Sequence, residues 1–140
     1  MPYRKATIRP YRPEDESLLF LLAREAFGDQ AAWSDEAALG ATGTDTVFVA
    51  ELDGEPAGYV ALVQEARTLR IEHLLVSPRH EHEGVGRQLL DYAEGYAISC
   101  RATALQVVVE ATNRRALDLY RRRGFVAIGA DVYELSLPTG

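Results

Sequence analysis

Cysteine is nearly absent from this chain. Of its 140 residues only Cys100 is a cysteine, which excludes a disulfide bond within the chain. Because Cys100 falls on the apolar stripe of an expected helix, we interpret it as a small buried hydrophobic residue rather than a nucleophile. Repeats and low-complexity segments are also missing. The length therefore predicts a single domain over residues 1–140, which buries roughly two-thirds of the unfolded surface.

Long apolar runs and an excess of positive charge are missing as well. No run approaches the ~18 apolar residues of a membrane span, and the first residues, Met-Pro-Tyr-Arg-Lys-Ala-Thr, lack the apolar core of a signal peptide. We therefore expect a cytoplasmic protein with no membrane partner. The net charge of −6 disfavours nucleic acid as a partner and favours a cationic one, such as an amine.

Periodicity and turn residues predict an alternation of strands and helices. Strands are expected at residues 7–9, 47–52, 57–64, 67–76, 105–110, 125–128 and 132–137. Helices are expected at 13–27, 34–39, 85–100 and 113–123. Antiparallel hairpins come first and a strand–helix–strand crossover follows. The predicted fold class is therefore α/β, with a mixed antiparallel and parallel sheet flanked by helices on both faces.

The most informative segment runs from Asn113 to Phe125 and reads Asn-Arg-Arg-Ala-Leu-Asp-Leu-Tyr-Arg-Arg-Arg-Gly-Phe. Asn113 is a favoured N-cap for a helix. Ala116 and Tyr120 recur at the spacing of one buried helix face, and Gly124 can end the helix in a left-handed conformation. The segment thus places a phenol on the buried side of a short helix, which suits a site that handles a proton.

A second motif, Gly84-Val85-Gly86, opens a helical pattern directly after an apolar strand run at 71–76. Glycines between a strand and a helix let backbone N–H groups approach a phosphate, with the positive end of the helix dipole behind them. Alone this pattern is weak, because short glycine motifs occur by chance and depend on their structural context.

Together the two motifs resemble the GCN5-related N-acetyltransferase (GNAT) family, and the resemblance covers nearly the whole chain. Further matching features are Ile8-Arg9-Pro10 with Glu14-Asp15, the glycines Gly54 and Gly58 around a central hairpin, and Val76-x-Pro78 before the glycine loop. The resemblance implies a single GNAT-like domain. It also implies that two central parallel strands, ending near Val76 and Glu110, splay apart to admit a cofactor.

The resemblance implies acetyl-CoA as the acyl-donor cosubstrate and direct attack by an amine within a ternary complex. The residues implied to hold acetyl-CoA are Leu74, Leu75, Val76, Glu81, His82, Glu83, Gly84, Val85, Gly86, Arg87 and Asn113. The strand residues among them would act through their main chain. The arginines at 114, 115, 121, 122 and 123 have two interpretations: a solvated helix face that compensates the dipole, or, for the first two, an anchor for CoA phosphates.

Two side chains are candidates for catalysis. Tyr120 would protonate the departing thiolate as a general acid; the alternative is one more aromatic on an apolar helix face. Glu72 would be the general base, because partial burial in an apolar strand raises the pKa of a carboxyl toward the working range. Strand alternation predicts that Glu72 shares a face with Leu74. Glu110 is the second candidate for the base and His73 the third.

The sequence departs from the family pattern at the glycine loop, where Glu81, His82 and Glu83 replace residues that are usually basic or polar. Two carboxylates beside a pyrophosphate oppose its binding by about 1 kcal/mol each in solvent. His80 and His82, with the glutamates, could instead form a metal site. Zinc sites usually need three or four convergent ligands, and no further Cys or His occurs at ligand spacing, so we expect no metal.

The expected acceptor is a primary amine, on a small molecule or as an exposed peptide N-terminus or lysine. Its walls would come from residues 27–39, including Trp33, and from the turn at 129–133. Dimers are common in the family, which allows a homodimer. Two alternatives stay open: a non-catalytic acyl-CoA-binding or interaction domain with the same fold, and a donor with a longer acyl group.

Overall fold

The computed structural model describes residues 4–27, 45–81 and 83–138. Seven strands form one sheet in the order β1-β2-β3-β4-β5-β7-β6. The strands are β1 (Thr7–Pro10), β2 (Asp45–Leu52), β3 (Glu55–Glu65), β4 (Thr68–Val76), β5 (Ala104–Val108), β6 (Val126–Gly129) and β7 (Val132–Ser136). The helices are α1 (Glu16–Phe27), α2 (Val85–Ser99) and α3 (Arg114–Arg122), with the short 3-10 turns η1 (Pro13–Asp15) and η4 (Pro78–His80).

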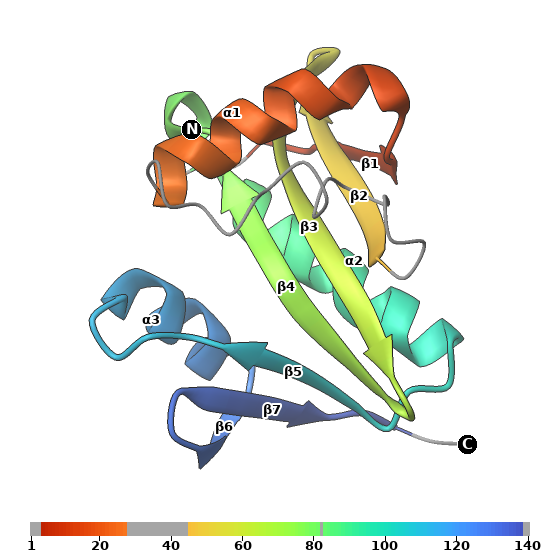
Figure 1. Ribbon diagram of the computed structural model, residues 1–140, viewed down its shortest axis with the longest axis vertical. Helices are drawn as coiled ribbons and strands as arrows, with labels where there is room; N and C mark the ends of the chain where they lie inside the picture. The colour runs from red at the N-terminus through yellow and green to blue at the C-terminus, as the bar shows by residue number, and fades with distance from the viewer. Residues whose placement is uncertain (1–3, 28–44, 82, 139–140) are drawn as a thin grey trace.

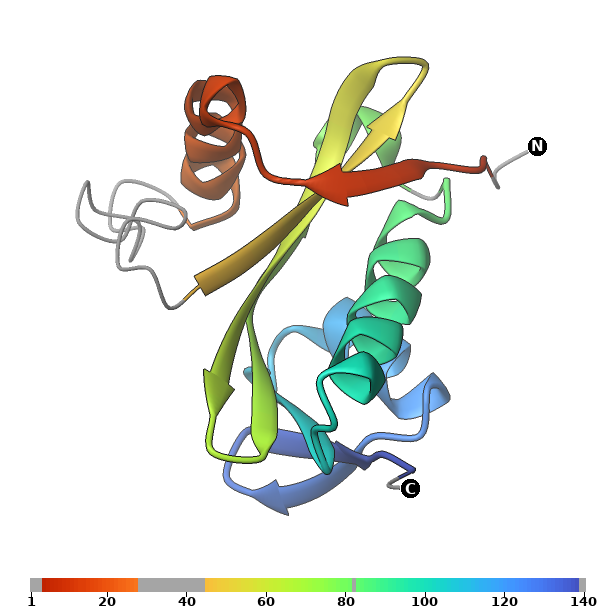
Figure 2. The same cartoon turned by 90° about the vertical axis from the view of Figure 1, so that its right-hand side faces the viewer.

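The sheet separates two layers of helix. Helix α1 covers one face, whereas α2 and α3 lie on the other, as a comparison of Figure 1 with Figure 2 shows. On the α1 side, Leu19 packs with Val49 and Tyr59 in a small apolar cluster. On the other side, a larger cluster joins the sheet to α2 and α3 and includes Leu89 and Tyr120. The α/β class and the helices on both faces are thus confirmed.

Strands β4 and β5 run parallel but pair over a short stretch only, from Thr68 with Ala104 to Ile71 with Val107. Beyond this point β4 continues to Val76 beside β3, while β5 turns away toward α3 (Figure 1). The mixed sheet is therefore as the sequence pattern predicts, and the parallel strands splay as the family resemblance implies. The splay opens the sheet at the carboxyl ends of two strands, where ligands bind in open α/β sheets.

A β-bulge interrupts β4 where the two strands part. Ala61 of β3 pairs with His73, but the next residue of β3 pairs with Ile71, so Glu72 is an extra residue in β4. In consequence Ile71 and Leu74 both contact the larger apolar cluster although they lie three positions apart. A regular strand would place them on opposite faces. The bulge turns Glu72 toward the α1 side of the sheet.

Element ends differ from the expected ones by a few residues. Strand β6 begins at Val126 because Phe125 completes the end of α3. Cys100 is the half-buried C-cap of α2 and not part of its apolar stripe. The helix expected at 34–39, together with Trp33, lies outside the described residues. Within the described ranges, no helix is long and apolar enough to cross a membrane.

An ion-pair network ties β1 to the start of α1. The Arg9 guanidinium donates to both carboxylate oxygens of Asp15 at 2.8 Å and to Glu51 at 2.7 Å. The backbone N–H of Arg12 also donates to Asp15, at 2.8 Å. These contacts, that of Arg9 first, lower the pKa of the buried Asp15 carboxyl.

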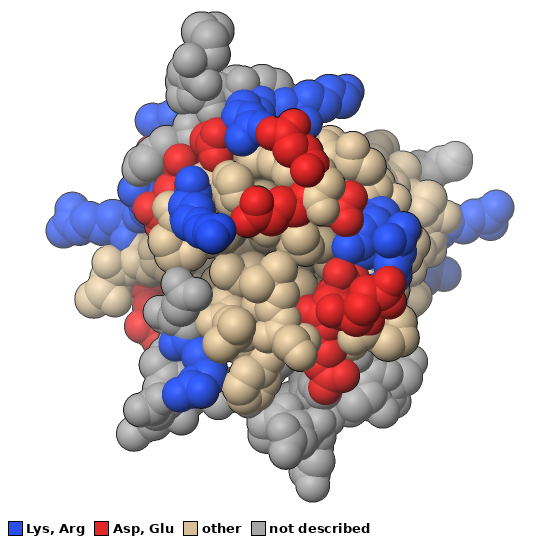
Figure 3. All heavy atoms as spheres, turned by 90° about the horizontal axis from the view of Figure 1, so that it is seen from above, with Lys and Arg blue, Asp and Glu red and all other residues tan. Residues whose placement is uncertain are grey.

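Seen from above, charges of both signs lie side by side, so the net negative charge forms no single patch on that face (Figure 3).

Candidate functional site

The loop between β4 and α2 ends in a left-handed turn at Gly84, whose φ of 83° suits glycine. Gly86 lies in the first turn of α2. A Cβ at Gly86 would meet Val76 Cγ2 at 3.6 Å and Leu74 Cδ2 at 3.8 Å, which are ordinary contact distances. Packing within the described part of the chain therefore does not require a glycine there. The space at this helix start is what a bound phosphate group needs.

Gln88 braces the glycine turn from within, and the sequence analysis did not identify it. Its Oε1 accepts the backbone N–H of Ala6 at 2.8 Å, and its Nε2 donates to the carbonyls of Arg4 at 2.6 Å and Gly84 at 3.1 Å. The Arg4 N–H donates in turn to the carbonyl of Glu83 at 2.9 Å. Gln88 is buried on the inner face of α2, so a polar residue at an inward position was the available signal.

The predicted pantetheine-binding residues, Leu74, Leu75 and Val76, lie at the open end of β4. On one side they pair with β3. On the side toward β5 they have no ladder partner within the described ranges, because that pairing ends at Ile71. Gly58 of β3 is sterically required here, since a Cβ would lie 2.5 Å from the Leu75 carbonyl oxygen. The backbone edge of β4 is therefore held firmly on one side and open on the other.

The glutamates of the loop have basic partners. Glu83 Oε1 lies 2.9 Å from His80 Nδ1, and Glu83 Oε2 lies 3.3 Å from the Arg4 guanidinium. The hydrogen bond from His80 and the contact with Arg4 lower the pKa of the Glu83 carboxyl. Glu81 pairs with Arg115 of α3 at 3.4 Å, and both side chains are exposed. The carboxylate of Glu83 is thus directed toward the N-terminal segment, whereas that of Glu81 spans from the loop to α3.

Helix α3 is capped at both ends, as the sequence predicts. The Asn113 Oδ1 accepts the backbone N–H of the third helical residue at 3.2 Å. At the other end Gly124 has a φ of 101°. Its N–H donates to the Arg121 carbonyl at 3.0 Å, and the Phe125 N–H donates to the Tyr120 carbonyl at 3.1 Å. This pair of bonds is the Schellman motif, which fixes the register of the last turn.

The Schellman motif positions Tyr120. The rings of Tyr120 and Phe125 meet edge to face with centroids 5.2 Å apart, the apolar contact that accompanies this motif. Tyr120 is 4% exposed and belongs to the apolar cluster against which Leu74 and Val76 pack. Burial raises the pKa of its phenol above the ordinary value, so the group keeps its proton at neutral pH. It can therefore donate that proton to a developing anion.

Glu72 differs from its prediction in two respects. It is an exposed residue rather than a partly buried one. The bulge also places it opposite Leu74 and Val76 and not on their face. Its carboxylate accepts a hydrogen bond from Arg70 Nε at 3.0 Å, and the same guanidinium pairs with Glu65.

The remaining candidates are dispersed around the site. Glu110 is exposed, and its carbonyl accepts the N–H of Asn113 at 2.9 Å. His73 is half-buried on the α1 side, with its ring centroid 6.3 Å from that of Tyr59. His82 lies outside the described residues, and the described ones contain no group of three or more side chains that could hold a metal.

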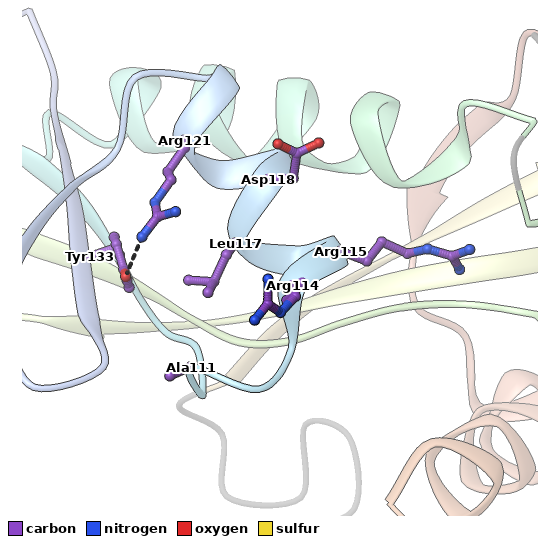
Figure 4. Close-up of a pocket in the computed structure, with 7 residues that line it drawn as sticks. All are labelled: Ala111, Arg114, Arg115, Leu117, Asp118, Arg121 and Tyr133. Atoms are coloured by element: carbon purple, nitrogen blue, oxygen red, sulfur yellow. Dashed lines mark hydrogen bonds between the residues drawn. The ribbon is translucent and has the colours of Figure 1, made fainter.

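Two pockets flank α3. One of about 420 Å³ lies between α3 and the start of α2 and is lined by Arg87, Arg115, Asp118, Leu119, Arg122 and Arg123. The other, of about 620 Å³, lies on the β7 side and is lined by the residues drawn in Figure 4: Ala111, Arg114, Arg115, Leu117, Asp118, Arg121 and Tyr133. Both volumes are in the range of small-molecule sites. The first pocket joins the predicted cofactor residue Arg87 to the capped helix.

A sheet that parts beside a glycine turn and a capped helix defines the class of protein, an α/β domain with a ligand site at its strand ends. Comparison with known families specifies it further. Residues 9–125 match the model of the Acetyltransferase (GNAT) family. The chain belongs to this family, which the sequence motifs predict.

Curated relatives match part of their length. Streptothricin acetyltransferase from Streptomyces lavendulae is 38% identical over 98 residues, which cover 66% of this chain and 52% of the relative. Spermidine N(1)-acetyltransferase from Escherichia coli is 30% identical over 90 residues, covering 62% and 48%. The chain thus spans about half the length of these relatives.

Solved structures share the fold over nearly the whole chain. The PaiA N-acetyltransferase from Thermoplasma acidophilum, in complex with coenzyme A, has a TM-score of 0.78 at 20% identity and covers 95% of this chain and 99% of its own. The ribosomal-protein-S18-alanine N-acetyltransferase from Escherichia coli has a TM-score of 0.80 at 20% identity, covering 97% and 95%. At this identity the likeness concerns the fold alone.

Proposed function

We propose that this chain is an acetyl-CoA-dependent N-acetyltransferase that moves an acetyl group to a primary amine by direct attack in a ternary complex. The observation that carries the proposal is the parting of β4 and β5 beside the Gly84 turn, with Tyr120 buried in the adjoining cluster. Membership of the acetyltransferase family and the acetyltransferase names of the relatives support it.

The donor would be bound mainly by main chain. Backbone N–H groups of Val85 and Gly86, at the positive end of the α2 dipole, would hold the pyrophosphate. The open edge of β4 at 74–76 would hydrogen-bond the pantetheine arm and orient the thioester carbonyl. Arg87 and the cap residue Asn113 stand on the two helices that flank this path. Acetyl-CoA itself supplies the activated acyl group.

Transfer requires one bond to form and one to break. The amine nitrogen attacks the carbonyl carbon with its lone pair, the C–S bond breaks, and the sulfur leaves as a thiolate. Tyr120 would give its phenolic proton to that thiolate, because its burial keeps it neutral until an anion develops nearby. The proton that the amine loses would return to solvent through a general base.

Glu72 is the proposed base, with Glu110 as the second candidate and His73 as the third. The bulge at the splay point supports Glu72, because it turns this carboxylate to the face opposite the larger core, where an acceptor can approach. Arg70 orients it. The names of the spermidine and streptothricin relatives support a small-molecule amine as acceptor. A peptide N-terminus or lysine is the second acceptor class.

The test is thiol release from acetyl-CoA across a panel of amines and peptides, together with thermal melts. Acetyl-CoA at 100 times its Kd should stabilise the fold by about 2.7 kcal/mol. Tyr120→Phe should lower kcat about tenfold or more with unchanged acetyl-CoA affinity, because the hydroxyl acts only in the transition state. Tyr92→Phe is the matched control, since that ring lies on α2 and packs against Phe48.

Three outcomes would count against parts of the proposal. No stabilisation at millimolar acetyl-CoA would remove it altogether. Equal turnover by Tyr120→Phe would return that residue to a packing role. If Glu110→Gln removes the acidic limb of the pH–rate profile and Glu72→Gln does not, the base is Glu110.

The alternative of a non-catalytic acyl-CoA-binding domain predicts stabilisation by acetyl-CoA without thiol release from any amine. A longer acyl donor would be recognised by faster release from that acyl-CoA. A cytoplasmic location and a homodimer stay predictions, the second of which sedimentation of the purified chain would check.

A further inference from the structure

Seven of the fourteen arginines form an ion pair with a described carboxylate. Ion pairs are formed by Arg4, Arg9, Arg70, Arg79, Arg115, Arg122 and Arg123. Arg114 and Arg121 form none with a described carboxylate, yet both line the same pocket on the β7 side of α3. In a chain with a net charge of −6 this is a local excess of positive charge around a cavity.

The geometry of the pocket brings the two guanidinium groups to one side. Arg114, Leu117 and Arg121 form a stripe along α3, and Figure 4 shows all three on the side toward β7. Arg121 Nη2 donates to the Tyr133 hydroxyl at 3.5 Å, and its Cζ lies 5.9 Å from the centre of that ring. Asp118 is the one carboxylate among the lining residues. In Figure 4 it points away from Tyr133.

The carboxylate of Asp118 does not offset the charge of the pocket. It pairs at 3.0 Å with Arg122, one turn further along the helix. Arg115 also lines the pocket but pairs with Glu81 on its other side. The uncompensated positive charge is therefore that of Arg114 and Arg121.

Helix stability does not explain Arg114. It is the first residue of α3, where the helix dipole is positive, and the first turn of α3 contains no acidic residue. The start of α1 shows the usual pattern, with Glu16 in its first turn. A cation at the N-terminal end weakens a helix, whereas an anion bound beside it would be attracted by both the guanidinium and the dipole.

We infer that this pocket binds an anionic group, a carboxylate or a phosphate, carried by the acceptor near the amine that is acetylated. The inference rests on the proposed function and narrows its substrate class from amines in general to amines that also carry a negative charge. Arg114 and Arg121 would supply the charged donors, which bind carboxylate and phosphate with good geometry. Tyr133 would hold Arg121 in position.

The donor is the other source of such an anion, since CoA carries phosphates. The geometry favours the acceptor, because the pocket on the opposite flank of α3 contains Arg87 from the start of α2 and adjoins the glycine turn. The β7 pocket contains no residue of that turn. Instead it includes Tyr133, which belongs to the turn at 129–133 that is one of the two predicted acceptor walls.

The experiment compares matched acceptors that differ in one charge. Phenylalanine with phenylalaninamide and lysine with lysinamide would be used with acetyl-CoA, and kcat/KM would be calculated per unprotonated amine. The native chain should prefer the carboxylate member at least tenfold. The double variant Arg114→Gln with Arg121→Gln should reduce that ratio to near one. Arg67→Gln, which removes one exposed positive charge far from the pocket, should keep the native ratio.

Two further arms identify the source of the anion and test the role of Tyr133. Tyr133→Phe should lower the ratio by less than the double variant, because it removes only the hydroxyl that orients Arg121. Acetyl-CoA and 3′-dephospho-acetyl-CoA would be titrated against both chains. If the double variant loses affinity for acetyl-CoA but not for the dephospho form, the pocket binds the donor and the inference is overturned. A native ratio near one would overturn it too.

Failure of the proposed function would be visible separately, as absence of thiol release with every amine. In that case anion binding by the pocket is tested through the melting temperature of each chain, measured with increasing inorganic phosphate at fixed ionic strength. A rise in the native chain and in Arg67→Gln, but not in the double variant, supports an anion site. Equal rises in all three chains overturn it.

Discussion

Arginine has different surroundings in two regions of this molecule. Near the N-terminus, the Arg9 side chain is 12% exposed and donates three hydrogen bonds to the carboxylates of Asp15 and Glu51, with a fourth to the Pro10 carbonyl. Around α3, Arg114 and Arg121 are exposed and have no carboxylate partner among the described residues. The first set joins β1, β2 and η1, whereas the second set lines a pocket.

The contrast shows why the same residue type can be structural in one place and available to a ligand in another. A buried charge has lost its water and is stable only when paired, so Arg9 is committed to its partners. An exposed guanidinium keeps its hydration, and leaving it unpaired has little cost. The charged groups on α3 are therefore the ones that a ligand can recruit.

The largest expected effect is a loss of stability at Gly58, where β3 pairs with the end of β4. Gly58→Ala would place a Cβ 2.5 Å from the Leu75 carbonyl oxygen and 3.2 Å from Val76 Cα, both backbone atoms. We expect a loss of about 3 kcal/mol in the free energy of unfolding, measured by urea denaturation, because a β-strand cannot yield as a side chain can.

The matched control is Gly95→Ala on α2, where a Cβ would meet nothing within 4 Å of the described atoms. This variant should gain about 0.5–1 kcal/mol, since glycine is unfavourable inside a helix. A Gly58→Ala protein as stable as the native chain would show that the β3–β4 pairing is looser than described.

The comparison of buried and exposed ion pairs can be tested with two aspartates. Asp15→Asn should cost about 1.5–3 kcal/mol, because it weakens hydrogen bonds between charged groups at a buried site. Asp118→Asn, which breaks the exposed pair with Arg122, should cost less than about 1 kcal/mol. Equal losses would remove the distinction between the two regions.

The stabilisation from the ion pair between Arg9 and Asp15 depends on pH, because the pKa of the Asp15 carboxyl is lowered in the folded state. Because the folded state holds this proton more weakly than the unfolded state, the stabilisation is complete above the unfolded pKa of about 3.9 and is lost as the pH falls through the folded value. The stability difference between the native chain and Asp15→Asn should thus be constant from neutral pH to about pH 4 and shrink below it. A difference that shrinks already between pH 7 and pH 5 would contradict this.

The smallest expected effect is on acetyl-CoA affinity. It concerns the exposed ion pair between Glu81 of the β4–α2 loop and Arg115 of α3. Glu81→Gln should tighten acetyl-CoA binding a few-fold at low salt and less at high salt, because it removes an exposed negative charge. Glu83→Gln should leave the affinity unchanged, since its carboxylate is held by His80 and Arg4. The opposite order of effects would show that Glu83 faces the donor.

Local motifs carried most of what could be predicted. The cap at Asn113, the left-handed Gly124 and the inward Tyr120 are set by residues within one short helix, so sequence spacing predicts them. The splay followed from the family resemblance and not from periodicity. The predicted face and burial of Glu72 were wrong, because a bulge is a property of two paired strands and leaves no mark in the alternation of one.

Long-range polar contacts were the other limit of prediction. Gln88 lies on α2, but its three hydrogen bonds reach Arg4, Ala6 and Gly84, and two of these residues are more than 80 positions away. No local pattern specifies which backbone groups such a side chain will meet. The same holds for the pairing of Glu83 with Arg4, which gives the loop carboxylate a direction that the sequence does not reveal.

The short pairing of β4 with β5 also bears on aggregation, because it leaves part of a strand edge unpaired. An unpaired strand edge is the feature through which proteins add strands from other molecules and aggregate. Here the open edge beyond Ile71 lies within the strand order, between β4 and β5, whereas β1 and β6 form the two ends of the sheet. A strand of another chain would have to enter between β4 and β5 to pair with this edge. The edge offered to a ligand is therefore not an outer edge of the sheet.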